Sequence, residues 1–226
     1  MFQPPTHNSD EEMKSNPPQE EVTIHTKHHR LKAEVYFDVI ETSRVKVDKK
    51  LFTEMCRTGC SNYNNKYCCP PHSPEFTSHI GNHDRLLLVM VKIDLDQLAQ
   101  AKYKEYHKVR MTNTIIKSRI EKVMRSLEGE SGTKFMSTGA CRLCKPCQKK
   151  LSRPCKHPQE MRFSLEALGA DCNKLAQDAF GKPLLWYEKK HAPAYTAVIC
   201  ALPLKAGHDK SEFYKLLGRR VDEIVK

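Results

Sequence analysis

RLLLVMVKI, at residues 85–93, is a short and continuous apolar block that begins at a charged residue. A run of this length, rich in branched side chains, is typical of a strand that is buried on both faces rather than of a helix. We therefore predict that these residues form a central strand, against which the rest of the domain packs.

Further strands are predicted on both sides of this block. VYFDVIE, at 35–41, alternates Val35, Phe37 and Val39 on one face, which indicates a half-buried strand. The other predicted strands are KFMST (134–138), LLWYE (184–188) and YTAVICAL (195–202). Cys200, inside the last of these, is expected in the core.

Helical patterns separate the predicted strands. The predicted helices are 49–56 with Asp48 as its cap, 96–128 with Gly129 as its stop, 172–180 between Asp171 and Gly181, and a last one that begins at Asp209 or Ser211. Strands that alternate with helices indicate an α/β domain. We expect a mixed sheet flanked by helices, with two cysteine-rich metal-binding loops beside the ends of these elements.

Charge and composition set the N-terminal segment apart. Residues 1–26 hold five acidic residues, one lysine and four prolines, which gives a net charge of −4 and leaves +15 for the rest of a chain whose total is +11. A segment so poor in apolar residues is typical of disorder. We predict a disordered acidic tail over 1–30 and a single domain over 31–226.

Eight of the ten cysteines fall into two compact groups. They are Cys56, Cys60, Cys68 and Cys69 in the first, and Cys141, Cys144, Cys147 and Cys155 in the second. The second group reads CRLCKPCQKKLSRPC, in which three thiols at intervals of three and a fourth after seven residues can surround one inorganic centre.

Clustered cysteines form disulfides in oxidising compartments, and bind metals or act as redox groups in reducing ones. The opening residues MFQPPTHNSDEEMK lack the basic and apolar regions of a signal peptide, and no stretch approaches the roughly 20 apolar residues of a membrane span. We therefore expect a cytoplasmic protein without membrane contact, whose thiols bind metal.

The spacing of the second group bears on which metal it binds. Zinc sites usually use two separated CxxC pairs, whereas CxxCxxC with a remote cysteine is similar to the bacterial ferredoxin run that binds a cubane cluster. Here Cys155 lies farther away than in ferredoxins and is followed by Lys156 instead of proline. The pattern favours a [4Fe-4S] cluster, with zinc as the alternative. For the first group a structural zinc, a second cluster and a site shared with the second group all stay open.

Three motifs in order carry a family resemblance: CRTGCSNYNNKYCCPP (56–71), GACRLCKPCQKKLSRPCKHP (139–158) and RFSLEALGADC (162–172). Together they resemble a prokaryotic family of predicted metal-binding proteins, catalogued as a domain of unknown function. The ligands that this resemblance implies are Cys56, Cys60, Cys69, Cys141, Cys144, Cys147 and Cys155. Cys68 stands where the family has a non-cysteine residue, and Ala140, Phe163 and Cys172 also depart from the family pattern.

Basic residues surround the second group: Arg142, Lys145, Lys149, Lys150, Arg153, Lys156 and His157. Cations at these positions would stabilise a negatively charged cluster and raise its reduction potential, and Arg142 and Arg162 are the expected cofactor-binding residues. The same charges would also suit the phosphates of a nucleic acid, although the loop has few aromatic residues on which bases stack.

The sequence holds no phosphate-binding Gly-rich loop, HExxH, GxSxG or dinucleotide fingerprint. Any catalysis would therefore belong to the metal centre, and whether the protein is an enzyme stays open. Cys172, next to the cap Asp171, is either a reactive thiol or a small buried side chain. We predict a redox, electron-transfer or cluster-handling role with a redox partner protein. The alternative is a structural-zinc module that binds nucleic acid through its basic surface.

Overall fold

The computed structural model describes residues 19–188, 190–205, 211, 214, 215 and 217. Its core is one sheet of four strands in the order β1(Gln19–His25), β2(Arg30–Glu41), β3(Arg85–Asp94) and β4(Tyr195–Leu204). β3 pairs with a neighbour on both edges, and Val89 lies opposite Phe37 on one side and Cys200 on the other. The predicted central strand is confirmed, and so is the α/β class.

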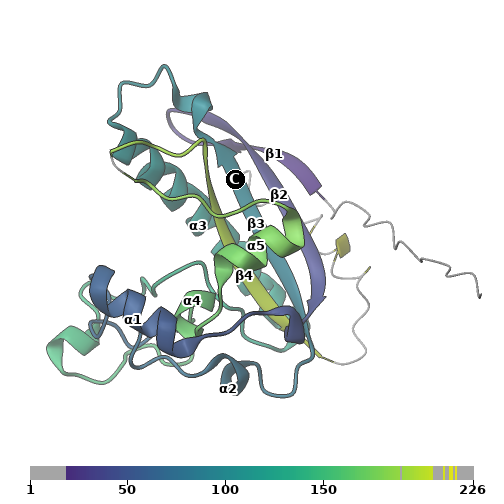
Figure 1. Cartoon of the computed structure of the whole chain (residues 1–226), viewed down its shortest axis with the longest axis vertical. Coiled ribbons are helices and arrows are strands. Elements are labelled where there is room, and N and C mark those ends of the chain that lie inside the picture. The colour runs from purple at the N-terminus through teal and green to yellow at the C-terminus, as the bar shows by residue number, and fades with distance from the viewer. Residues whose placement is uncertain (1–18, 189, 206–210, 212–213, 216, 218–226) are drawn as a thin grey trace, which may run out of the picture.

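Each face of the sheet is covered (Figure 1). Helix α3(Glu105–Ser131) packs on one face, where Val35, Phe37 and Val39 join the odd-numbered residues of β3 in a buried cluster. On the other face, Tyr36, Ile40 and the even-numbered residues of β3 pack against α2(Phe76–Ile80), α4(Leu165–Leu168) and α5(Cys172–Phe180). Burial on both faces explains why β3 is apolar from Leu86 to Val91 and why β2 is more than half-buried.

All three strand pairings are antiparallel, whereas the sequence pattern predicts a mixed sheet. The connection from β3 to β4 explains the difference. The chain returns along one face of the sheet as α3, then passes over the other face through α5, and so comes back to the end of β3. There the Leu95 N–H donates to the Ala194 carbonyl at 2.9 Å, and β4 starts in the opposite direction.

Strand β1 corrects the predicted boundary of the tail. Residues 19–25 pair with β2, and Val22 and Ile24 point into the α3-side core, while Glu20 and Glu21 pair with Val35 and Glu34 at the sheet edge. The acidic composition of this segment concealed an alternation of apolar residues that is long enough for an edge strand. Disorder of residues 1–18 stays a prediction, because they lie outside the described residues.

The predicted helices appear, with shifted ends. Helix α1(Lys49–Gly59) is capped by the Asp48 carboxylate, which accepts from the Leu51 N–H at 2.8 Å, and the Asp171 carboxylate caps α5 in the same way. The long helical stretch is broken into η2(Leu95–Leu98) and α3. Gly129 does not stop α3, which ends where Gly132 adopts a left-handed conformation.

Two predicted strands do not form. KFMST makes only isolated bridges, from Met136 to Ala201 and from Ser137 to Ser164, and LLWYE makes one bridge, from Glu188 to His191. Met136 thus reaches the edge strand β4 at a single pair, and neither segment extends into a ladder. Ser211, Tyr214, Lys215 and Leu217 are helical, and the rest of the predicted last helix lies outside the described residues. No helix among the described residues is long and apolar enough to cross a membrane.

Candidate metal centre

Apart from Cys56, which is on α1, the two cysteine groups lie on loops that contact each other at one end of the molecule, beside α1 and α4 (Figure 1). The Lys66 ammonium donates to the Cys141 carbonyl at 2.6 Å, and the Tyr67 hydroxyl donates to the Arg153 carbonyl at 2.8 Å. The Cys141 N–H donates to the Cys68 sulfur at 3.1 Å. Segments more than 70 residues apart in sequence therefore form one site.

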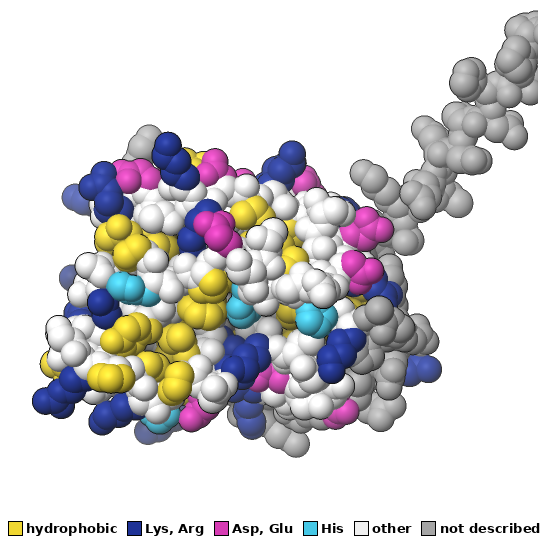
Figure 2. All heavy atoms as spheres, turned by 90° about the horizontal axis from the view of Figure 1, so that it is seen from below, with side chains coloured by type: hydrophobic (Ala, Val, Ile, Leu, Met, Phe, Trp, Pro, Cys, Tyr) yellow, Lys and Arg dark blue, Asp and Glu magenta, His cyan; other side chains and the backbone are white. Residues whose placement is uncertain are grey.

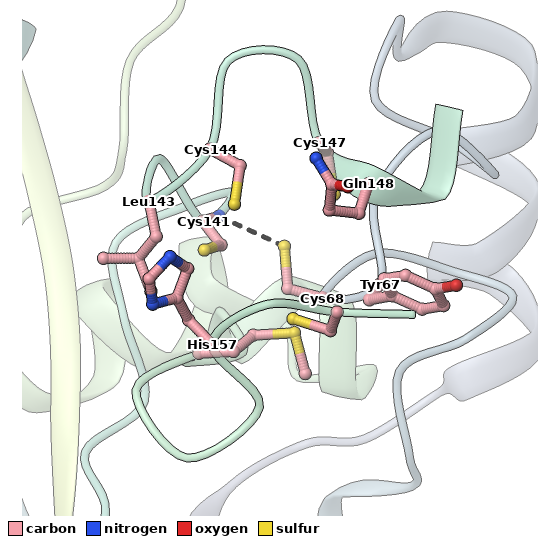
Figure 3. Close-up of a pocket in the computed structure, with 10 residues that line it drawn as sticks. Tyr67, Cys68, Cys141, Leu143, Cys144, Cys147, Gln148 and His157 are labelled. Carbon is pink, nitrogen blue, oxygen red and sulfur yellow. Dashed lines mark hydrogen bonds between the residues drawn. The ribbon is translucent and has the colours of Figure 1, made fainter. Parts of the chain in front are cut away.

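Five cysteines line a single pocket between these loops: Cys68 from the first group, with Cys141, Cys144, Cys147 and Cys155 from the second. Figure 3 shows the sulfur atoms of Cys68, Cys141 and Cys144 directed into the same space. Tyr67, Leu143 and Met161 add apolar surface, and Gln148 and His157 complete the lining. The second group thus lies together as its spacing predicted, and the first group contributes one thiol to it.

Cys68 is the member of the first group that faces this pocket. Hydrogen bonds from the Cys69 thiol and from the Cys141 N–H lower the pKa of Cys68 to about 7, although burial opposes the shift. The two sulfur atoms are 3.7 Å apart, and the hydrogen bond with Cys68, together with burial, raises the pKa of Cys69. Cys68 is therefore the thiol of this pair that is poised to be a thiolate.

The remaining thiols of the first group, Cys56, Cys60 and Cys69, lie outside the pocket lining. Cys56 is on α1 and Cys60 is its C-terminal cap, whose N–H donates to the Cys56 carbonyl at 3.0 Å. Burial and the neighbouring Cys60 raise the pKa of Cys56, and Cys60 also raises that of Cys69. Cys56, Cys60 and Cys69 thus lie near one another, and none of them lines the five-cysteine pocket.

Helix α3 anchors the second loop through two carboxylates. Glu121 accepts from the Ser137 hydroxyl at 2.7 Å and from Arg142 at 3.4 Å. Glu128 forms a two-pronged ion pair with Arg162, at 2.5 and 2.6 Å, in which both side chains are largely buried. The structure thus places Arg142 and Arg162 against acidic partners, and neither lines the five-cysteine pocket.

The motif RFSLEALGADC forms the support on which α1 and the first loop rest. The Ser164 hydroxyl caps α4 by accepting from the Ala167 N–H. Gly169 has φ +100°, and an added Cβ would lie 2.7 Å from the Cα of Lys49. The Lys49 ammonium in turn donates to the carbonyls of Ser73 and Ala167 at 3.0 and 2.5 Å. Only glycine permits this close approach of the two backbone segments.

Soft thiolates suit zinc, copper(I) or iron–sulfur clusters, so the donor set fits the metals that the sequence predicts. Among the residues that the structure describes, no three His, Cys, Asp or Glu side chains lie close enough together to hold one ion. The five-cysteine pocket leaves about 10 Å³ free, roughly the room of one water molecule. Any centre therefore requires these thiols to change position, and all five lie on loops.

The two single cysteines are core residues. Cys172 is 3% exposed, and burial, with the nearby Glu166, raises its pKa well above the usual value. Cys200 is 1% exposed, and burial raises its pKa as well. Of the two alternatives for Cys172, the structure favours the small buried side chain over the reactive thiol.

Two residues join the loops, Lys66 and Tyr67, and the sequence motifs do not predict either of them. The charge of Lys66 adds to the hydrogen bonds that lower the pKa of Cys68, and it opposes the burial that raises the pKa of Cys141. Their position directly before Cys68 is the only signal in the sequence, because the contact itself depends on how the loops dock.

The thiols of two loops line one pocket at the end of an α/β domain. This arrangement defines a class of protein, the cysteine-rich metal-binding domains. A family described as "Predicted metal-binding protein (DUF2284)" matches residues 38–201. Since the match covers more than half of the chain, the protein belongs to this family. No curated protein and no solved structure matches it.

Proposed function

We propose that the five-cysteine pocket holds an iron–sulfur cluster, [4Fe-4S] in type, and that the protein works in the cytoplasm in electron transfer or cluster handling. The observation that carries this proposal is the convergence of Cys68 with the CxxCxxC run and Cys155 on one pocket. All ten cysteines are unpaired, which suits a reducing compartment. When bound, such a cluster supplies one-electron redox chemistry.

Two local features would tune a cluster at this site. The Cys141 N–H already donates to the Cys68 sulfur, and hydrogen bonds to the ligand sulfurs are among the factors that set cluster potential. Lys66 binds the Cys141 carbonyl at 2.6 Å and Lys149 lies 5.8 Å from the centre of the Tyr67 ring, so positive charge flanks the thiols. Both features favour the reduced, more negative state.

Metal content tests the proposal directly. Protein purified without oxygen should contain iron and acid-labile sulfide in similar amounts and absorb broadly near about 400 nm, as thiolate-bound clusters do. Stoichiometric zinc without sulfide would contradict the cluster and support the structural-zinc alternative.

Single substitutions then identify the ligands. Cys144→Ala should lose the cluster, whereas Cys200→Ala should keep it and cost only about 1 kcal/mol as an ordinary core change. The adjacent pair Cys68 and Cys69 gives a sharper comparison, because both are buried and only Cys68 lines the pocket. We expect Cys68→Ala to lower the iron content and Cys69→Ala to retain it. The reverse result would assign the ligand to Cys69, as the family resemblance implies.

The surface around the pocket suits a protein partner. Figure 2 views this end of the molecule, where apolar side chains lie among many Lys and Arg side chains. Four large apolar side chains on α1 and the cysteine loops are exposed: Leu51, Met55, Leu143 and Leu151. We propose that an acidic redox protein docks here. Nucleic acid binding is the competing proposal, and submicromolar RNA affinity that falls steeply with salt would support it instead.

A further inference from the structure

A second cavity, of about 220 Å³, lies between α3, the segment 184–186 and β4. Its polar lining consists of Asn113, Lys117, Thr138, Glu166 and Thr196, and its apolar wall includes Leu184, Trp186, Val198 and Ile199. A cavity of about 150 Å³ is enough to hold benzene. The space therefore accommodates a small organic molecule, and its lining combines an apolar wall with a few polar groups, as ligand pockets do.

Lys117 is the cation of this cavity. Its ammonium forms no hydrogen bond or close ion pair with the residues that the structure describes. Burial lowers its pKa, and this effect outweighs the more distant carboxylates of Glu166 and Glu121, which raise it. It lies against the backbone of Gly139, where an added Cβ would be only 3.2 Å away. A partly buried ammonium without a bonded partner is costly unless an anion joins it.

Glu166, the first-turn acidic residue of α4, lines the same cavity. A hydrogen-bond acceptor and a donor thus face one space that is walled by Leu184, Trp186 and Ile199. Asn113 is already engaged, since its side-chain oxygen accepts from the Thr196 hydroxyl at 2.8 Å. The Thr138 hydroxyl is engaged too, because it donates to Glu121 at 3.3 Å. The charged groups that face the cavity are therefore Lys117 and Glu166, and Glu166 also lies against the Cys172 thiol.

We propose that this cavity binds a small α-hydroxy or α-amino acid. The carboxylate pairs with Lys117, the hydroxyl or ammonium group donates to Glu166, and the aliphatic side chain lies against Leu184 and Ile199. The site does not depend on which metal the five-cysteine pocket holds.

The cavity is next to the cysteine loop. Asn113, Lys117, Glu121 and Arg125 follow one another at intervals of four along α3, so they form one polar stripe on the helix. Asn113 and Lys117 line the cavity, and Glu121 binds the segment that leads to Cys141. Thr138, three residues before Cys141, lines the cavity itself. A bound acid would thus contact the backbone that positions the cysteines.

Trp186 supplies the test, because it lines the cavity and is the only tryptophan of the chain. Its fluorescence is followed while the full-length, purified protein is titrated with leucine, with 2-hydroxy-4-methylpentanoate and with leucinol, which lacks the carboxylate. We expect a saturable change with at least one of the two acids and none with leucinol. No saturable change with either acid up to about 10 mM, well above a millimolar dissociation constant, would overturn the proposal. An equal response to leucinol would overturn it too.

The Lys117→Met variant should bind the acid at least about tenfold more weakly, since it loses a charge-assisted hydrogen bond, and Lys117→Arg should retain binding. Unchanged affinity in Lys117→Met would contradict the assigned role. The comparison of leucine with leucinol needs only the parent protein, so it decides the question even if the variant does not fold. Iron content, measured on the same samples, reports separately on the cluster.

Discussion

The sheet and the cysteine end of the molecule are held together in different ways. In β3, every residue from Leu86 to Val91 is fully buried among apolar neighbours on both faces. The two cysteine loops have few such residues and depend on single polar contacts, such as Lys66 to Cys141 and Arg162 to Glu128. In the sheet, many buried side chains share the stabilisation, whereas the loops are stabilised by a few separate polar contacts.

This difference predicts where the structure tolerates change. Losing one methyl group from a large core removes a small part of its stability, but losing one partner of a buried ion pair leaves an uncompensated charge. Stability of the cysteine end should therefore be concentrated in a few identifiable residues.

The largest effect is expected for Glu128→Ala. Glu128 pairs with the largely buried Arg162 and also accepts from the Phe135 N–H at 2.9 Å. Removing it leaves the Arg162 guanidinium without a carboxylate partner and should lower the free energy of unfolding by about 3–5 kcal/mol. Urea unfolding at neutral pH measures the change.

Glu54→Ala is the matched control, because Glu54 also pairs with an arginine at 2.5 Å, but both side chains are more than half exposed. Little change is expected there, since solvent already screens the pair. Similar losses in the two variants would show that the cysteine end has no special dependence on its buried anchor.

A second, smaller effect is expected for Gly169→Ala. The positive φ and the 2.7 Å approach to the Cα of Lys49 mean that a methyl group must push α1 and α4 apart. We expect a loss of about 1–3 kcal/mol. Gly59→Ala, in α1 with nothing within 4 Å of the new Cβ, should be neutral or stabilise by roughly 0.5–1 kcal/mol. A neutral Gly169→Ala would mean that the α1–α4 contact is loose.

The same contrast explains what the sequence could predict. β3, β4, α1 and α5 follow from local patterns of apolar residues and caps, and their predicted ends lie within three residues of the observed ones. β2 is predicted too, but it begins five residues earlier than its alternating pattern indicates. KFMST and LLWYE have strand-like composition, but they form isolated bridges and no ladder; KFMST reaches the edge strand β4 only at the pair Met136 and Ala201. β1 was missed because its acidic residues outweighed the apolar pair Val22 and Ile24.

The sequence predicts the residues of the cysteine site, but it does not predict how they are arranged in space. Spacing alone placed Cys141, Cys144, Cys147 and Cys155 together, because neighbours in one loop cannot be far apart. Whether Cys68 or Cys69 joins them depends on how two loops dock, through contacts such as Tyr67 to Arg153. No local pattern encodes that choice. Arg162 is a predicted cofactor-binding residue because it lies beside the cysteine loop in sequence. Its ion pair with Glu128, 34 residues away, is a contact that the sequence does not show.

The smallest effect concerns His79, where the apolar core meets the cysteine end. His79 is on α2, its ring lies edge-on to Phe163 at 5.5 Å, and its Nε2 atom is buried without a hydrogen-bond partner among the described residues. Burial, with Arg162 and Lys134 nearby, lowers its pKa. The folded state therefore holds a neutral ring, while the unfolded state binds a proton once the pH falls below the ordinary histidine pKa of about 6.5.

It follows that His79 contributes stability above about pH 6.5 that is lost as the pH falls toward its lowered folded pKa. His79→Phe keeps the ring and removes the titration. Between about pH 7.5 and 5.5 the parent protein should lose up to roughly 1 kcal/mol more than this variant, because the other histidines titrate equally in both. Urea midpoints at the two pH values measure the difference. Parallel pH dependence in the two proteins would show that the His79 ring is accessible to protons in the folded state, and that the boundary between the apolar core and the cysteine end is open to water.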